Sequence, residues 1–510
     1  MFPACHHVAG AHIVRIVRSL LHSTFVAMSF AMFVALQVTH VHAEWPQFRG
    51  ANSAGKATQA VPVEFGPGKN ELWSVPLDAG HSSPCIAGGR IFLTTYQPEA
   101  SKLFVVCLNQ ADGETLWSRE VPTTEIEKGH PSFNPASSSP TTDGERVVAY
   151  FGSFGLICFD MSGRKLWDVQ MPITRSYAGN ATSPMIAGDR VILYRGNHVD
   201  HFLLAVNKQT GEELWRVEQD EPFASELACT SVPIVHGDRL LIHSARSVQA
   251  FDLSTGKQIW FTKCATTATS TPVIAGKDVI VAAWNKMGEP ALRPEFPSYD
   301  DLITRHDKNT DGLISRDEFP HMMIFHRPDG AEAPQNGAPL RFNSADRDRD
   351  GTLTTGEWSR KLAELDEFRS RYKTHGMLAI PVDSQGFVDA KDVRLLENQG
   401  IPEVPSPLYD EGILYFVKNG GVLTTVDVAT GKRLSRTRTK GKGTHYASPI
   451  IAGGKLYSTA GNGTISVMEL GPRPKLLAVN DMRDRTYATP AAVDGVLYVR
   501  THSRLYAFGD

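Results

Sequence analysis

The sequence predicts an all-β protein folded as an eight-bladed β-propeller, with a small α-helical insertion in the fifth blade. A short phrase repeats eight times, the last copy lacks a strand that the N-terminal region can supply, and one interval between copies is far longer than the rest. Short strands with glycine turns at a period of about 40–45 residues are typical of four-stranded propeller blades. We therefore expect residues 44–510 to form one ring rather than the about three domains that a length of 510 residues suggests.

Each copy of the phrase starts with Ser, Thr or Val followed by proline, and continues through two apolar stretches separated by a Gly or Asp turn. A third apolar stretch ends in Asp or Asn, and a glycine turn then leads to Trp, as in residues 205–215 and 250–260. This pattern predicts four short strands per copy. The prolines that mark the eight copies are Pro84, Pro140, Pro184, Pro233, Pro272, Pro407, Pro449 and Pro490.

The last copy is incomplete. After Pro490 the chain supplies about three strands and stops at Asp510. Residues 71–77 carry the pattern of a fourth strand with no first three before it. Pairing this closing strand with the last copy would complete the ring and remove its exposed sheet edges.

Repeats of the form A-x-D-x-x-T-G-x-x-x-W resemble the pyrroloquinoline-quinone (PQQ) repeat of quinoprotein dehydrogenases and of BamB, the outer-membrane assembly factor. The opening at 44–50 also resembles the start of many exported bacterial PQQ-like propellers. The resemblance covers roughly 45–293 and 374–510 and implies the propeller fold. The repeated tryptophans, which bury a large aromatic area, are expected to pack between neighbouring blades. They are Trp73, Trp117, Trp167, Trp215 and Trp260.

The long interval, from Pro272 to Pro407, contains two acidic twelve-residue loops at 307–318 and 346–357. Both follow the EF-hand pattern, in which oxygens at positions 1, 3, 5, 7, 9 and 12 surround calcium and glycine at position 6 permits the turn. We expect residues 294–373 to be an EF-hand pair that binds two calcium ions. The predicted ligands are Asp307, Asn309, Asp311, Leu313, Ser315 and Glu318 in the first loop, and Asp346, Asp348, Asp350, Thr352, Thr354 and Glu357 in the second.

The segments that flank these loops differ in how strongly their sequences predict a helix. Residues 298–306 and the stripe that begins at Trp358 have helical periodicity. Pro320 intrudes on the helix that leaves the first loop, and Pro334 and Pro339 shorten the helix that enters the second. This pattern favours a structural calcium pair over a sensor that opens.

The insertion falls between the second and third strands of its blade, so it emerges on the face where the inner strands begin. PQQ-like enzymes bind their cofactor in the axial funnel on this face, and the resemblance makes His81, Asn180, Glu226 and His445 candidate cofactor-binding residues, with Glu226 and Asn180 as a possible calcium pair. The favoured interpretation is that these polar side chains cap strands and bind water. No catalytic residue is assigned, because no two cysteines are adjacent and no GxSxG, HExxH, P-loop or CxxCH motif is present. Asn134, Tyr446 and Tyr487 also precede inner strands.

Residues 1–43 read as a secretory signal peptide. Arg15 and Arg18 precede an apolar run at 25–36, and Val41-His42-Ala43 supplies the small residues of a cleavage site. The alternative is an uncleaved membrane anchor. A disulfide between Cys229 and Cys264 is compatible with export, although buried free thiols are favoured.

Composition excludes one class of function. With 52 basic against 55 acidic residues, the chain offers no electrostatic case for binding nucleic acid. We expect an exported protein, periplasmic or secreted, that binds calcium and acts as a binding or scaffold protein rather than an enzyme. It is expected to be monomeric, to have a protein or cell-envelope partner and to have no membrane span after signal cleavage. The alternatives are a PQQ-dependent dehydrogenase that oxidises an alcohol or sugar, and a BamB-like outer-membrane assembly factor.

Overall fold

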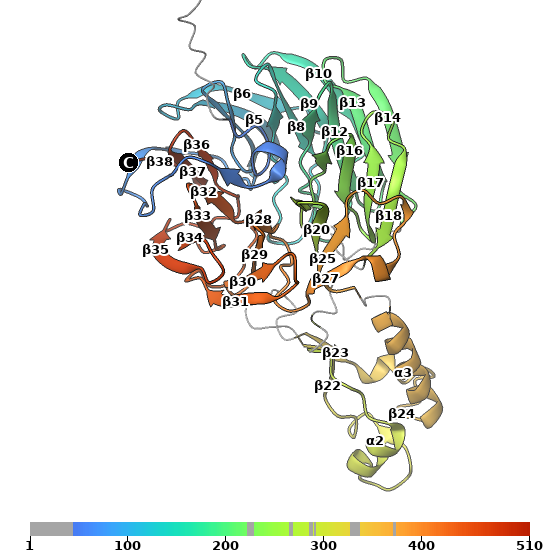
Figure 1. Cartoon of the computed structure of the whole chain (residues 1–510). Helices are drawn as coiled ribbons and strands as arrows, with labels where there is room; N and C mark the ends of the chain where they lie inside the picture. Colours follow the sequence, from blue (N-terminus) through green and yellow to red (C-terminus); the bar gives the residue numbers. More distant parts are fainter. Residues whose placement is uncertain are drawn as a thin grey trace, which may run out of the picture. The chain divides into compact units, whose positions relative to one another are not determined.

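The computed structural model describes residues 44–221, 229–264, 269–284, 289, 292–326, 337–370 and 374–510. The chain from Glu44 onward folds into eight antiparallel sheets of a β-propeller with an inserted EF-hand segment in the fifth sheet (Figure 1). The predicted fold class is therefore confirmed.

The first four blades follow one another directly along the chain. Blade one holds β3 (Cys85–Ala87), β4 (Arg90–Gln97), β5 (Lys102–Asn109) and β6 (Thr115–Val121); blade two holds β7 (Thr141–Thr142), β8 (Arg146–Phe151), β9 (Gly155–Asp160) and β10 (Lys165–Gln170). Blade three holds β11 (Met185–Ala187), β12 (Arg190–Gly196), β13 (His201–Asn207) and β14 (Glu213–Glu218); blade four holds β15 (Ile234–His236), β16 (Arg239–His243), β17 (Ser247–Asp252) and β18 (Gln258–Lys263).

The last four blades include the interrupted one and the closing one. Blade five holds β19 (Val273–Ala275), β20 (Asp278–Ala283), β25 (Gly376–Pro381) and β27 (Arg394–Glu397); blade six holds β28 (Leu408–Asp410), β29 (Ile413–Lys418), β30 (Val422–Asp427) and β31 (Arg433–Arg438). Blade seven holds β32 (Ile450–Ala452), β33 (Lys455–Thr459), β34 (Thr464–Glu469) and β35 (Lys475–Asp481); blade eight holds β36 (Ala491–Val493), β37 (Val496–Arg500), β38 (Arg504–Phe508) and β2 (Glu71–Pro76). Two short parallel strands, β1 (Lys56–Ala57) and β26 (Gly386–Phe387), extend the sheets of blades seven and four.

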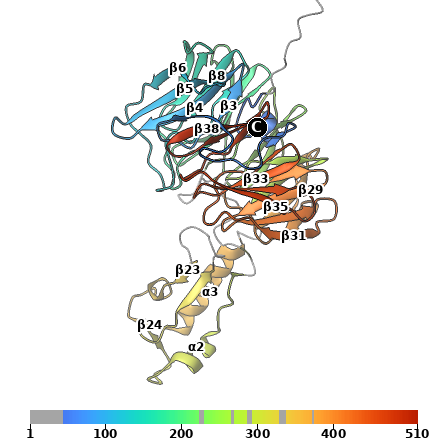
Figure 2. The same ribbon diagram turned by 90° about the vertical axis from the view of Figure 1, so that its left-hand side faces the viewer.

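The two ends of the propeller chain meet in blade eight. Strand β2 pairs antiparallel with β38, with Val75 opposite Leu505, and so takes the fourth position that the last copy lacks. Blade one then lies beside β38 (Figure 2), and one apolar cluster joins Ile86 and Ile91 of blade one to Leu497 and Phe508 of blade eight. Strand β2 therefore covers the edge that β38 would otherwise expose.

The repeated tryptophans join neighbouring blades, as the sequence predicts. Trp215 of blade three donates a hydrogen bond from Nε1 to the carbonyl of Leu253 in blade four (3.3 Å). Its ring lies against Gly256, where an added Cβ would stand 2.7 Å from the ring. Gly256 has φ +71°, so both its conformation and its missing side chain are required. The equivalent bonds come from Trp73, Trp117, Trp167 and Trp260.

The residue before each repeated proline links the blades around the axis. The backbone N–H of Ser83 donates to the hydroxyl of Ser139 in the next blade (2.8 Å), and the ring closes where Thr489 donates to Ser83 Oγ (3.0 Å). At the junction of blades three and four Val232 has no hydroxyl to accept the bond. The other donors of this hydroxyl ring are Ser139, Val232, Thr271, Ser406 and Ser448.

The insert has its own small core and differs from the predicted helices. Its elements are α2 (Tyr299–His306), β21 (Ile314–Ser315), β22 (Met322–Phe325), β23 (Ala338–Leu340), the 3-10 turn η3 (Phe342–Ser344), β24 (Thr352–Leu353) and α3 (Thr355–Ser370). The first loop is followed by β22 rather than by a shortened helix, since Pro320 removes a backbone donor and β22 pairs with β23. In the described part of the insert, β23 and η3 precede the second loop, whereas α2 and α3 occur where the pattern predicts them.

The five cysteines of the propeller, Cys85, Cys107, Cys158, Cys229 and Cys264, are free and buried. The Cys229–Cys264 disulfide that the sequence allowed is therefore not formed, and the favoured buried thiols are confirmed. Among the described residues, no helix is long and apolar enough to cross a membrane.

Candidate functional site

The two acidic loops of the insert fix their first carboxylate in the same way. Asp307 accepts hydrogen bonds from the backbone N–H groups of Thr310 (2.7 Å) and Gly312 (2.9 Å), at loop positions four and six. In the second loop Asp346 accepts the same two bonds from positions four and six (2.7 and 3.3 Å). Position six is Gly312 in one loop and Gly351 in the other, with φ of +79° and +92°, which glycine adopts without strain.

The last residue of each loop turns back over its start. Glu318 accepts hydrogen bonds from the backbone N–H (2.9 Å) and hydroxyl (2.6 Å) of Ser315, and from the N–H of Lys308 (2.8 Å). Glu357 accepts the equivalent bonds from Thr354 (3.0 and 2.9 Å). The Ser315 hydroxyl and these backbone donors lower the pKa of Glu318 to about 2, so its carboxylate is ionised at neutral pH.

The carboxylates of the second loop converge. One oxygen from each of Asp346, Asp348 and Asp350 lies within 4.8 Å of the other two. Clustered carboxylate oxygens on a loop whose backbone turns at glycine are the donor set that calcium prefers. In the first loop Asn309 takes the middle position between Asp307 and Asp311, so that loop carries one fewer acidic group.

A short sheet couples the two loops. Ile314 pairs with Leu353 across β21 and β24, as the sequence predicts. The hydroxyl of Tyr299 in α2 donates to the carbonyls of Leu353 (2.5 Å) and Gly312 (3.2 Å), so one side chain touches both loops. The two loops therefore share a sheet and a hydrogen-bonding side chain.

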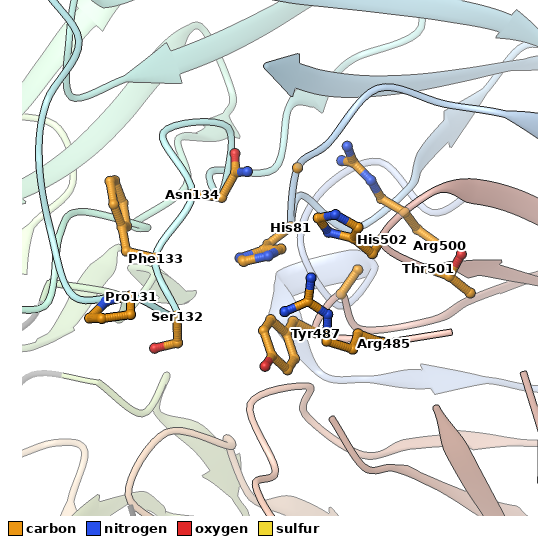
Figure 3. A pocket seen from close by; sticks show the side chains of 12 residues that line it. His81, Pro131, Ser132, Phe133, Asn134, Arg485, Tyr487, Arg500, Thr501 and His502 are labelled. Atoms are coloured by element: carbon orange, nitrogen blue, oxygen red, sulfur yellow. The ribbon is translucent and has the colours of Figure 1, made fainter. Parts of the chain in front are cut away.

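The second site lies at the face where the inner strands begin. A cavity of about 130 Å³ opens there between blades eight and one. Three of the polar residues that the sequence placed at this face line it, His81, Asn134 and Tyr487, and Tyr446 packs edge-on against Tyr487 at 4.9 Å. The cavity is also lined by Gly80, Pro131, Ser132, Phe133, Arg485, Ala488, Arg500, Thr501 and His502 (Figure 3).

Asn180 and His445, two of the other predicted funnel residues, do not line this cavity. Asn180 and His445 are buried elsewhere around the axis, at 1% exposure each, and Glu226 lies outside the described residues. Neither amide atom of Asn180 has a hydrogen-bond partner among the described residues. The Nδ1 atom of His445 lies 3.2 Å from the carbonyl of Gly443. Of the three funnel candidates among the described residues, only His81 lines this cavity.

Sequence reasoning missed the cationic residues of the cavity. Arg500 ends β37, His502 lies in the turn to β38, and Arg485 lies in the link before β36. The turn between the second and third strands emerges at the same end as the link between blades. If this rule of strand connection is applied to the sequence of blade eight, it places all three residues on the face where the inner strands begin.

His81 is held neutral by its surroundings. Burial lowers its pKa to about 3, and the positive charges of Arg500, His502 and Arg485 act in the same direction. The ring packs edge-on against Tyr487 at 4.9 Å. Figure 3 shows His81, Tyr487, Arg485 and His502 gathered on one side of the cavity, with Pro131, Ser132 and Phe133 on the other.

Comparison with known proteins supports the repeat interpretation. The family model described as outer membrane protein assembly factor BamB matches residues 63–176 and 104–295, and the EF hand model matches residues 341–363. The chain is therefore similar to the PQQ-like β-propeller family over residues 63–295. No protein in a search of curated sequences matches this PQQ-like propeller.

Solved structures share the PQQ-like propeller fold at low sequence identity. BamB from Moraxella catarrhalis aligns with a TM-score of 0.51 and 11% identity, covering 86% of this chain and 97% of its own. A europium-containing methanol dehydrogenase aligns with a TM-score of 0.53 and 11% identity, covering 92% and 98%. Quinohemoprotein alcohol dehydrogenase from Comamonas testosteroni aligns with a TM-score of 0.52 and 12% identity, covering 92% and 81%. These similarities establish the fold.

The cavity between blades eight and one does not fit PQQ. The cavity of about 130 Å³ is smaller than the roughly 300–1,000 Å³ of pockets that enclose an organic ligand. No Asp or Glu lines it, so the cavity offers no carboxylate to a calcium ion beside a quinone. Of the carboxylate–amide pair that the resemblance implies, only Asn180 lies among the described residues.

Proposed function

We propose that this PQQ-like propeller is an exported calcium-binding scaffold protein, whose inserted EF-hand pair holds two calcium ions and whose axial face binds a partner. The repeated hydrogen-bond pattern of the two loops carries the proposal. The same loop positions fix Asp307 and Asp346, and the same positions fix Glu318 and Glu357.

The predicted ligands divide into side chains and carbonyls. Carboxylate, amide or hydroxyl oxygens would come from positions one, three, five, nine and twelve, and the carbonyls of Leu313 and Thr352 from position seven. The second loop has four acidic ligands and the first has three. The second site is therefore expected to bind calcium more tightly, because each added carboxylate strengthens the attraction to a divalent cation.

The calcium pair is proposed to be structural. A sensor opens by moving helices on either side of each loop. Among the residues that the structure describes, the first loop is followed by β22 and the second is preceded by β23 and η3. The buried side chains of Tyr299, Trp358 and Leu365 pack in one core beneath both loops. We expect calcium to stabilise this core rather than to expose it.

Single substitutions in the full chain test the calcium sites. Glu318→Gln and Glu357→Gln are each expected to remove one high-affinity site in calorimetric titration, since each replaces the bidentate ligand at position twelve. Asp317→Asn is the matched control, because Asp317 is an exposed acid at position eleven of the first loop and is not a predicted ligand. Loss of binding in the control as well would show that general acidity, rather than the loop geometry, attracts calcium.

The structural likeness to alcohol dehydrogenases makes a PQQ-dependent dehydrogenase the alternative function. Purified protein with added PQQ and calcium, assayed for dye-linked oxidation of alcohols and sugars, separates the two. The scaffold proposal expects no turnover and no PQQ binding. Clear turnover would replace it with the dehydrogenase.

Export and a protein or cell-envelope partner complete the proposal. The BamB family model supports a partner, because the proteins that it describes act in assembly. Residues 1–43 are proposed to be a cleaved signal peptide, so the exported chain should begin at Glu44, be monomeric and have no membrane span. N-terminal sequencing and the mass of the exported protein test this directly.

A further inference from the structure

The cavity between blades eight and one is lined by the guanidinium groups of Arg485 and Arg500, by the neutral imidazole of His81 and by the imidazole of His502. No Asp or Glu lines it. Arg485 and His502 are exposed, and among the described residues neither side chain forms a hydrogen bond or an ion pair. The nearby carboxylate of Asp484 already accepts bonds from Ser503 and from the N–H of Arg485.

Arg500 forms the buried floor of the cavity. Its side chain is 1% exposed, and it donates to the carbonyls of Ser82 (3.1 Å), Thr94 (2.9 Å) and Asp78 (3.3 Å) and to the Ser82 hydroxyl. Its Nε has no partner among the described residues. A Cβ at Gly80 would stand 2.2 Å from Arg500 Nη2, so the absence of a side chain at Gly80 admits the guanidinium. A buried cation that no carboxylate contacts is costly unless an anion approaches.

The opposite wall supplies neutral donors. The Asn134 Oδ1 atom accepts the N–H of Ala136 (2.8 Å), which leaves the Nδ2 group available to donate. The link that carries Asn134 is fixed by Phe133, whose ring lies 2.2 Å from where a Cβ at Gly179 would stand. Donors therefore face the cavity from both sides (Figure 3).

We propose that this cavity binds a tetrahedral oxyanion, the sulfate or phosphate group of a ligand that docks on the axial face. Its volume of about 130 Å³ is sufficient for a group of this size. Guanidinium and imidazole donors that reach the cavity from several directions can each bond a different oxygen of a tetrahedral anion, whereas a carboxylate offers only two oxygens. This inference rests on the proposed function, in which the axial face binds a partner, and it names the chemical group of that partner.

Titration of the full chain with sodium sulfate, phosphate and acetate, followed by NMR or calorimetry at constant ionic strength, tests the proposal. Sulfate or phosphate is expected to bind more tightly than acetate, and the tighter of the two identifies the source of the group. Arg485→Gln and His502→Gln are each expected to weaken binding by about ten-fold or more. Because both side chains are exposed and unpaired, the variants should retain the fold.

Arg483→Gln is the matched control, since Arg483 is exposed, lies two residues from Arg485 and does not line the cavity. It should bind the anion like the parent. Equal weakening by Arg483→Gln, no saturable binding to the parent, or acetate binding as tightly as sulfate and phosphate would overturn the proposal. Calcium titration of the same variants distinguishes failure of this proposal from failure of the proposed function. If the protein binds two calcium ions but no anion, only the anion site is rejected.

Discussion

Glu127 is a buried carboxyl group in the link between blades one and two. It is 5% exposed, receives a hydrogen bond from the hydroxyl of Thr174, and has no partner for Oε1 among the described residues. Burial raises the pKa of Glu127 to about 8, against an ordinary value of 4.5, and the Thr174 bond and the charge of Arg195 offset only part of this shift. The folded protein therefore binds a proton here that the unfolded chain releases at lower pH.

The raised pKa predicts a pH-dependent stability that Glu127→Gln removes. The stabilising contribution of the protonated carboxyl is complete below pH 4.5 and is lost as the pH rises through about 8, by at most about 1.4 kcal/mol per pH unit. The parent should lose stability relative to Glu127→Gln between pH 5 and pH 8 in thermal or urea unfolding. A stability difference that stays constant over this range would contradict the assignment.

Residues such as Glu127 and Arg500 could not be predicted from the sequence. The partners of Arg500 include Ser82, which lies 418 residues away, and local patterning carries no signal for such a contact. His81, Asn134 and Tyr487 were predictable, because each immediately precedes an inner strand. The sequence placed these three residues on the correct face but did not indicate that arginines would share their cavity.

At the scale of the element, the contact between a tryptophan and the next blade's glycine turn explains the recurring T-G-x-x-x-W pattern. Trp117 lies against Gly163 and Trp167 against Gly211, each at 2.7–2.8 Å from an added Cβ. The glycine of one blade is thus required by the tryptophan of the blade before it. This coupling is local in each copy, which is why the repeat could be read from the sequence.

Gly256→Ala is predicted to destabilise the protein more than Gly276→Ala. Both glycines have positive φ, +71° and +62°, so both substitutions share the conformational cost of about 1–2 kcal/mol. Only the Cβ at position 256 meets the ring of Trp215, whereas nothing lies within 4 Å of one at 276. Chemical unfolding should show an additional loss of about 1–3 kcal/mol for Gly256→Ala. Equal losses would show that the ring contact contributes nothing.

The calcium loops and their neighbouring segments differ in how far the sequence predicted them. The loops could be predicted because the hydrogen bonds that shape each of them lie within twelve residues. Glycine and acidic residues at fixed spacing determine the hydrogen bonds of Asp346 and Glu357. The segments after the first loop depend instead on pairing between β22 and β23, which are separated in sequence. Proline correctly indicated that the helices would be disturbed but did not indicate the strands that replace them.

At the scale of the whole molecule, the hydroxyl ring joins the blades around the axis. Seven bonds of 2.8–3.1 Å link seven of the eight repeated residues to the hydroxyl of the next blade, the exception being Ser183, which faces Val232. The bond from Thr489 to Ser83 closes the ring between the last blade and the first, as strand β2 does at the outer edge. The residue before each repeated proline therefore links neighbouring blades as well as leading into a strand.

Thr271→Val is predicted to destabilise the ring by about 1–3 kcal/mol. The substitution removes the acceptor of the Val232 N–H (3.1 Å) and leaves that donor buried. Val232→Thr is the converse control, since it offers a hydroxyl at the one junction that lacks it and should cause no such loss. If urea unfolding shows equal effects for the two variants, the ring bonds are not what stabilises the junction.

The count of calcium ions bound by the full chain tests the central claim most directly. Equilibrium dialysis of the metal-free protein against calcium should give two ions per chain, with one each for Glu318→Gln and Glu357→Gln. This result follows from two loops that share one hydrogen-bond pattern. Binding of no calcium by the parent, or of two ions by both variants, would contradict the account.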